Sequence, residues 1–115
     1  MEMAYEEAIS MREELQRSSG DPIFVKTMMQ SNVTGGFWLG LPAEFCQQNL
    51  PRHDTTITLV DEAEAGTAAF YRADKTGISA GWRRFVLEHG LVQGDCVVFQ
   101  LIHPIIFKVY IVRQQ

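Results

Sequence analysis

The sequence lacks any apolar run that approaches the about 20 consecutive apolar residues that a membrane helix needs. Its first 16 residues, MEMAYEEAISMREELQ, are acidic and lack the basic start and apolar block of a secretory signal. These two absences predict a chain that does not enter a membrane and that stays inside the cell.

Cysteine and histidine are also scarce. Cys46 and Cys96 are 50 positions apart, and they do not form the closely spaced pair of a zinc site. In a chain that is not secreted, we expect them to be buried thiols and not a disulfide. The three histidines share no short spacing with one another or with a cysteine, so we expect no metal site.

No arrangement typical of catalysis is present either. Both cysteines lie in apolar segments, and neither Ser31 nor Ser79 follows the strand–turn–helix pattern of a hydrolase nucleophile. The glycines of GGFWLG and AGW lack the lysine and hydroxyl residue of a phosphate-binding loop. We therefore expect a protein that is not an enzyme, with no cofactor and no small-molecule substrate.

Basic residues are not in excess. The net charge is −4, and residues 1–20, with five Glu and two Arg, account for −3 of it. Residues 21–115 carry nine acidic and eight basic side chains. A nucleic-acid-binding domain usually has a basic excess, which this nearly neutral body does not show.

An amphipathic segment comes first among the features that are present. Apolar residues at a helical spacing form one narrow stripe and predict a helix over 4–17: Ala4, Ala8, Met11 and Leu15. The stretch SSGDP at 18–22 ends this helix, because proline blocks its continuation. We divide the chain into an acidic helical lead-in or linker, 1–20, and a folded domain, 21–115. The lead-in is either a passive tail of a longer protein or a short helix that binds a protein partner or pairs with a second copy of itself.

Short apolar and β-branched runs follow from Pro22 onward, as is typical of strands. The predicted strands lie at 23–27, 37–41, 55–60, 67–72, 96–102 and 107–112. Two short helices are predicted between them, at 42–50, which starts with proline, and at 82–89, which Gly90 ends. Six or seven short strands with two short helices indicate a mainly β protein, either a small barrel or a sandwich.

Four segments together resemble the plant B3 DNA-binding domain. They are PIFVKTMMQSNVTGGFWLGLP at 22–42, ITLVD at 57–61, AGWRRFVLEHGLVQGDCVVFQL at 80–101 and FKVYIVR at 107–113. The most specific element is Gly81-Trp82, followed by Phe85 and by Gly94-Asp95 to Phe99. The resemblance covers 22–113 and implies a seven-stranded open β-barrel (a pseudobarrel) with two short α-helices, preceded by the N-terminal helical tail.

The resemblance also implies a function. Domains of this family bind double-stranded DNA with two loop arms in the major groove, as the DNA-reading module of a transcriptional regulator in the nucleus. The first arm corresponds to 26–36 and the second arm to 72–79, RADKTGIS. Small polar side chains suit a loop that enters a groove about 12 Å wide. Gly35-Gly36 allow the chain to turn back sharply from the tip of the first arm.

The DNA-binding residues that the resemblance implies lie in these arms and beside them: Lys26, Ser31, Asn32, Thr34, Arg72, Asp74, Lys75, Thr76 and Arg83. The cations are expected at phosphates, except that Lys75, at the tip of the second arm, reaches either a phosphate or a guanine edge. The polar residues of the first arm are the expected base readers. Asp74 either accepts a hydrogen bond from a cytosine amine, orients Lys75 or weakens binding.

Other residues are expected outside the contact set. Trp82 is expected in the core, and the remaining basic residues of the body are taken as surface charges: Arg52, Arg84, Lys108 and Arg113. About four contacting cations, each releasing roughly 0.9 counterions, predict a shallow salt dependence with a slope of about 3 to 4.

Two other functions remain open. A protein–protein interaction module on the same barrel, with little DNA affinity, suits the nearly neutral charge. A barrel that holds an apolar ligand is less well supported, because the apolar runs are those of a filled core.

Overall fold

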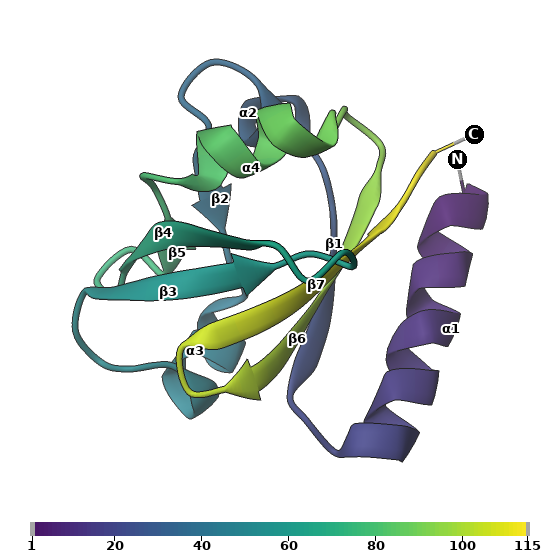
Figure 1. The fold of residues 1–115 in the computed structure, drawn as a ribbon, viewed down its shortest axis with the longest axis horizontal. Helices are drawn as coiled ribbons and strands as arrows, with labels where there is room; N and C mark the ends of the chain where they lie inside the picture. Colours follow the sequence, from purple (N-terminus) through teal and green to yellow (C-terminus); the bar gives the residue numbers. More distant parts are fainter. Residues whose placement is uncertain (1, 115) are drawn as a thin grey trace.

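The computed structural model describes residues 2–114 as one curled β-sheet with helices at its ends and on its outer face (Figure 1). Within these residues, the strands are β1 (Ile23–Thr27), β2 (Leu39–Gly40), β3 (Thr55–Val60), β4 (Gly66–Arg72), β5 (Gly77–Ile78), β6 (Cys96–His103) and β7 (Ile106–Val112). The helices are α1 (Glu2–Ser19), α2 (Gln30–Val33), α3 (Ala43–Asn49) and α4 (Trp82–His89).

The strands form one sheet in the order β1-β6-β7-β3-β4-β5-β2. Neighbouring strands are antiparallel except β3 and β7, which run parallel. β1 and β2 lie at opposite ends of this order, so the curled sheet is an open barrel. α2 and α4 lie at one end of the barrel and α3 lies at the other (Figure 1). The predicted seven-stranded open barrel is thus confirmed, and the sandwich is not formed.

Apolar side chains from alternate strand positions fill the barrel. Phe24 of β1 stacks on Phe99 of β6, and Phe45 of α3 meets Phe24 edge-on, with ring centroids 4.8 Å apart in both pairs. At the other end of the barrel, Trp82 of α4 is fully buried and stacks on Phe85, as expected of a core residue. Buried aromatic rings contribute the largest apolar areas to a core. These rings fix α3 and α4 to the two opposite ends of the barrel.

α1 packs against the outer face of β1, β6 and β7 (Figure 1). Ala4 and Ala8 of its predicted stripe are buried there in a second hydrophobic cluster, against which Met11 and Leu15 pack partly buried. The sheet members of this cluster are Ile23, Cys96, Val98 and Val112. Ala4 and Ala8 are 4% and 0% exposed, and their small size lets the helix backbone approach the sheet closely. The domain boundary between residues 20 and 21 remains a prediction. In the structure the lead-in helix packs directly against the sheet of the domain that follows it.

A buried glutamine ties the end of α1 to the sheet. The Nε2 of Gln100 donates to Oδ2 of Asp21 at 3.0 Å and to Oγ of Ser19 at 3.3 Å. The hydroxyl of Tyr110 donates to Oε1 of Gln100 at 2.7 Å. A buried amide needs such partners, because an unpaired polar group in the interior is costly. The same bonds fix the connection between α1 and β1.

The local structure differs from the predictions around the two arms. The strand predicted at 37–41 is shorter in the structure, where β2 covers only Leu39–Gly40. Phe37 has a φ of 51°, which is incompatible with a strand. α2 is an additional helical turn inside the predicted first arm, and β5 occupies part of the predicted second arm. Cys46 and Cys96 are free and buried, as predicted.

Candidate nucleic-acid interface

The structure narrows the first arm to residues 28–38, between β1 and β2. Met28, just before α2, and Val33, the last residue of α2, are 1% and 7% exposed and anchor the first arm in the core. Its exposed residues are small or polar apart from Met29: Gln30, Ser31, Thr34, Gly35 and Gly36. Gly35 has a φ of 64°, in the left-handed region that favours glycine. The first arm is therefore one helical turn and a glycine turn that present a polar surface.

Asn32 is buried, although we expected its side chain to be available to read bases. It is 6% exposed; its Oδ1 accepts the N–H of Met29 at 2.8 Å and its Nδ2 donates to the carbonyl of Trp38 at 3.1 Å. The backbone carbonyl of Asn32 accepts the indole Nε1–H of Trp82 at 2.7 Å. In this structure Asn32 therefore braces the first arm and does not present its amide to a base, contrary to the expectation.

Arg83, in the first turn of α4, lies beside the first arm. Its guanidinium carbon is 5.4 Å from the ring centroid of Phe37, which is within the range of a cation–π interaction. Phe37 in turn packs against the core. The exposed charge of Arg83 is thus held over a ring of the first arm, where a residue distant in sequence contributes to the same surface.

α4, which carries Arg83, is also fixed at its other end. The Nε2 of His89 donates to Oδ2 of Asp61 at 2.9 Å, and the N–H groups of Ala65 and Ala63 donate to Oδ1 of Asp61. The bond from His89 first, and then those from the backbone, hold the pKa of Asp61 below its ordinary value. The turn between β3 and β4 therefore helps to position α4.

The structure narrows the second arm to the turn 73–76 between β4 and β5. Asp74 and Lys75 are exposed at this turn. Thr76 has a φ of 47°, a conformation that a β-branched residue rarely adopts, and its hydroxyl donates to the carbonyl of Lys75 at 2.8 Å. Such backbone strain often accompanies side chains that are held in a fixed direction for a function.

Arg72, just before the second arm, has much of its charge offset. Its Nε lies 3.4 Å from Oδ2 of Asp54 and 3.7 Å from Oδ1 of Asp74. The other oxygen of Asp54 accepts the N–H of Ala73 at 2.9 Å. Asp54 was not singled out in the sequence, because only the fold brings it from the loop before β3 to the second arm. Arg72 is therefore the predicted cation least free to meet a phosphate.

The two arms meet where β2 pairs with β5 at the end of the sheet. The N–H of Leu41 donates to the carbonyl of Thr76 at 2.8 Å. Trp38 covers Gly77 so closely that a Cβ atom at Gly77 would lie 2.1 Å from the indole ring. The close approach requires glycine at this position, and it couples the end of the first arm to the end of the second.

Three predicted cations keep their charges free. Among residues 2–114, no carboxylate oxygen lies within 4.0 Å of a side-chain nitrogen of Lys26, Lys75 or Arg83. Lys75 and Arg83 are exposed, and Lys26 is half-buried in β1 just before the first arm. The structure thus assembles Ser31, Thr34 and these cations near the arms, while Asn32 and Arg72 are occupied by other partners.

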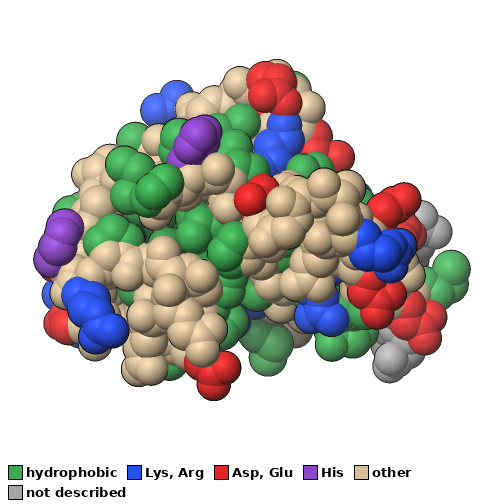
Figure 2. Space-filling view, turned by 90° about the horizontal axis from the view of Figure 1, so that it is seen from below, with side chains coloured by type: hydrophobic (Ala, Val, Ile, Leu, Met, Phe, Trp, Pro, Cys, Tyr) green, Lys and Arg blue, Asp and Glu red, His purple; other side chains and the backbone are tan. Residues whose placement is uncertain are grey.

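The acidic part of the chain lies away from the arms. The loop from α2 to β2 and the turn between β4 and β5 lie on the left of Figure 1, whereas α1 forms its right-hand margin. Figure 2 shows acidic side chains gathered at the end of the molecule where α1 lies. Most of the net negative charge is thus separated from the candidate interface, which reduces its repulsion of a polyanion.

Other kinds of site are not indicated in the described part of the chain. Over residues 2–114, no group of three or more His, Cys, Asp or Glu side chains is placed to hold a metal ion. Over the same residues, none of the helices has both the length and the apolar character that crossing a bilayer requires.

Comparison with known proteins identifies the family. A family model for the B3 DNA binding domain matches residues 24–115. The chain is 54% identical over 108 residues to the B3 domain-containing protein Os06g0194400 of Oryza sativa subsp. japonica, covering 92% of this chain and 46% of that protein. It is 49% identical over 110 residues to the B3 domain-containing protein At5g42700 of Arabidopsis thaliana, covering 94% of this chain and 52% of that protein. The chain thus spans about half the length of these curated relatives.

Two solved structures share the fold, each with a TM-score of 0.65. The hypothetical Arabidopsis thaliana protein At1g16640.1 is 23% identical, covering 81% of this chain and 91% of that chain. The Arabidopsis FUS3-DNA complex is 19% identical, covering 80% of this chain and 97% of that chain. At these identities the likeness concerns the fold.

The fold and the match over residues 24–115 define a DNA-binding domain on a curled seven-stranded sheet. The chain belongs to the B3 DNA-binding domain family. The matching family model describes a DNA-binding domain.

Proposed function

We propose that this domain binds double-stranded DNA sequence-specifically, with both arms in the major groove, as the reading module of a transcriptional regulator in the nucleus. The observation that carries the proposal is the coupling of the two arms at one end of the sheet through β2 and β5. Family membership supports it, as does the likeness in fold to a protein solved as a complex with DNA. Arms held in a fixed geometry lose less entropy on docking than free loops do.

The first arm supplies hydrogen-bonding groups. Ser31 and Thr34 are exposed, and their hydroxyls suit contacts with base edges in the major groove. The hydroxyl of Thr34 donates to the carbonyl of Gln30 at 2.8 Å, so it meets DNA as an acceptor. Arg83, held over Phe37, binds a backbone phosphate at the start of α4, and Lys26 binds another.

The second arm supplies charge. Lys75 meets a guanine edge or a phosphate, with Thr76 beside it. Asp74 lies close to Arg72 and lowers the positive potential at this arm, which makes binding weaker than the count of cations suggests. With Lys26, Lys75 and Arg83 as the free cations, the salt dependence has a slope of about 3.

Selection from a pool of random duplexes at two salt concentrations tests the proposal. We expect one enriched site. If Lys75 reads a base, Lys75→Ala should weaken binding by about 1–3 kcal/mol and relax specificity at that base position. If Lys75 binds a phosphate, the substitution should weaken binding to all duplexes by the same factor. Arg17→Ala is the matched control, because Arg17 is an exposed cation on α1 and should have little effect. Failure to enrich any site, or chemical-shift changes confined to a face without the arms, would contradict the proposal.

A protein–protein interaction module is the alternative. The exposed apolar side chains Leu87 and Val92, at 58% and 57% exposure, and the nearly neutral body favour it. A partner of α1 would have to meet the outer face of this helix, where Met3 and Tyr5 are exposed, because the apolar stripe packs against the sheet. Wild-type protein that retains no duplex even at low salt would support this alternative over DNA binding.

A further inference from the structure

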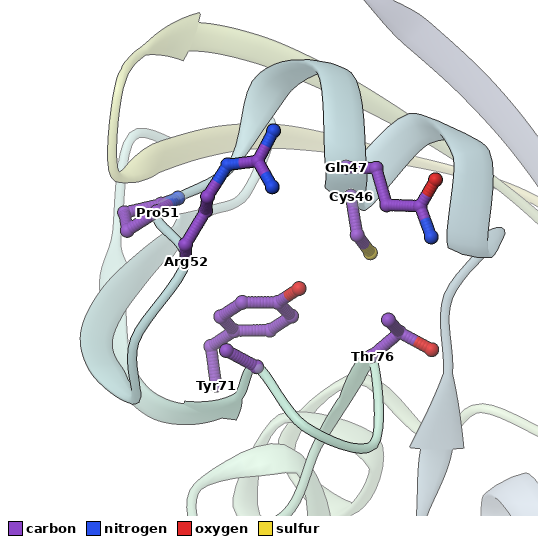
Figure 3. Close-up of a pocket in the computed structure, with 7 residues that line it drawn as sticks. Cys46, Gln47, Pro51, Arg52, Tyr71 and Thr76 are labelled. Atoms are coloured by element: carbon purple, nitrogen blue, oxygen red, sulfur yellow. The ribbon is translucent and has the colours of Figure 1, made fainter.

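A cavity of about 190 Å³ opens at the base of the second arm (Figure 3). Cys46 and Gln47 of α3 form one wall, Arg52 in the loop after α3 forms another, and Tyr71 lies between them. Pro51 and two residues of the second arm, Ala73 and Thr76, complete the lining. The cavity therefore shares residues with the arm to which we assign DNA binding.

Arg52 is the one charged residue of this cavity lining. It is exposed, and among residues 2–114 no carboxylate oxygen lies within 4.0 Å of its side-chain nitrogens. The neighbouring acidic residue, Asp54, is already bound to Arg72 and to the N–H of Ala73. The cavity thus has an uncompensated positive charge at its rim.

The floor of the cavity is neutral. Tyr71 and Cys46 are 1% and 3% exposed. Burial raises the pKa of the Cys46 thiol, and burial together with the neighbouring Cys46 raises the pKa of the Tyr71 hydroxyl. Both groups therefore stay protonated near neutral pH, and neither opposes the entry of an anion.

The open groups at the rim match the chemistry of a phosphate. Arg52 offers a planar fork of N–H donors that pairs with two oxygens of one phosphate, and Gln47 is an exposed carboxamide that donates a further hydrogen bond. Thr76 has already committed its hydroxyl proton to the carbonyl of Lys75. Arg52 and Gln47 are therefore the groups that an incoming oxyanion would meet.

We propose that this cavity receives one backbone phosphate of the DNA bound by the arms, with Arg52 as its cation and Gln47 as a second donor. The inference rests on the proposed function. It assigns to Arg52 the phosphate contact for which Arg72 is poorly placed, because Asp54 and Asp74 offset the charge of Arg72. The sequence alone suggested only a surface charge at Arg52.

Salt titrations with the selected duplex test this assignment. We expect Arg52→Gln to lower affinity about threefold to tenfold at 0.1 M salt and to reduce the salt slope by about 0.9, the release expected for one phosphate. Arg52→Lys should recover the slope and part of the affinity. The control, Arg17→Gln, makes the same charge change on α1 and should leave the slope unchanged. Equal slopes for Arg52→Gln and Arg17→Gln would overturn the phosphate site while leaving DNA binding by the arms intact.

A duplex with single neutral methylphosphonate linkages locates the phosphate. One linkage should weaken binding of the wild-type protein and have a smaller effect on Arg52→Gln, because both changes remove the same contact. If the two effects simply add at every linkage, Arg52 does not contact a phosphate.

Inorganic phosphate distinguishes a DNA phosphate from a free one. The side-chain amide signals of Gln47 should shift with the duplex and respond to inorganic phosphate only at tens of millimolar. A sub-millimolar response to inorganic phosphate, with none to the duplex, would assign the cavity to a free phosphate compound and overturn our proposal. Wild-type protein that binds no duplex at all would overturn the proposed function itself, which is a different outcome from an ineffective Arg52→Gln.

Discussion

The two arms are built differently, although they meet at the same pair of strands. The first arm is long and is held by buried hydrogen bonds, from Asn32 within the arm and from Trp82 below it. The second arm is a four-residue turn that contains a strained residue, Thr76, and follows the ion-paired Arg72. The first arm thus depends on the core for its shape, whereas the second depends on local backbone and charge. Substitutions in the first arm should therefore lower stability as well as DNA affinity, whereas substitutions in the second arm should change mainly DNA affinity.

Asn32→Ala should have the largest effect. It removes two partly buried hydrogen bonds, to the N–H of Met29 and to the carbonyl of Trp38, each worth about 0.5–1.5 kcal/mol. We expect the free energy of unfolding to fall by about 1–3 kcal/mol in chemical denaturation. DNA affinity should fall as well, because the first arm loses its shape.

Ser31→Ala is the matched control for this experiment. Ser31 is the exposed neighbour of Asn32, so its loss should change stability by less than about 0.5 kcal/mol. If Asn32→Ala keeps full stability and loses only affinity, Asn32 contacts DNA as the sequence first suggested, and the contrast between the arms is wrong.

Lys75→Ala should show the reverse behaviour in the second arm. Lys75 is exposed and has no carboxylate within 4.0 Å among residues 2–114, so stability should change by less than about 0.5 kcal/mol. DNA affinity should fall by about 1–3 kcal/mol. Asp74→Asn, next to it, should raise affinity and steepen the salt slope, since it removes one of the two carboxylates beside Arg72. A fall in affinity for Asp74→Asn would instead assign Asp74 to a base contact.

Acid should weaken the support of α4, which carries Arg83 beside the first arm. The folded-state pKa of Asp61 lies below its ordinary value of 3.8, mainly because of the hydrogen bond from His89. Its contribution to stability is therefore complete above about pH 4 and is lost as pH falls through the lowered pKa. Asp61→Asn should cost about 1 kcal/mol at neutral pH and flatten the acid limb of a plot of stability against pH. An unchanged acid limb would show that the bond from Asp61 to α4 contributes little.

The barrel was predictable from sequence because its long strands have clear patterns. The runs at 96–102 and 107–112 are apolar and β-branched over a full strand length, and Gly90 marks the end of α4. β5 has only two residues, Gly77 and Ile78, so no alternation exists from which to predict it. The resemblance, and not a strand pattern, implied the two arms at 26–36 and 72–79, and the connections between the observed strands lie at 28–38 and 73–76.

The candidate site was less predictable, because its properties depend on contacts across the fold. Ser31 and Asn32 are neighbours of similar polarity, yet Ser31 is exposed, whereas Asn32 is buried and hydrogen-bonded to Trp38 and Trp82. Arg52 and Arg72 carry the same charge, but only the structure shows which one has carboxylates beside it. The resemblance implied a set of candidate contact residues, and tertiary contacts decide which of their side chains remain free.

Thr76→Gly should have a small effect on stability, in the stabilising direction, and it tests the strained turn of the second arm. A left-handed conformation costs a residue with a Cβ atom about 1–2 kcal/mol, and glycine avoids this cost. Glycine also adds about 0.5–1 kcal/mol of unfolded-state entropy, so the net stabilisation should be about 0.5–1 kcal/mol. DNA affinity should nevertheless fall, because the turn that holds Lys75 becomes more flexible. If Thr76→Gly raises both stability and affinity in parallel titrations, the strained turn is not needed to hold Lys75 for binding.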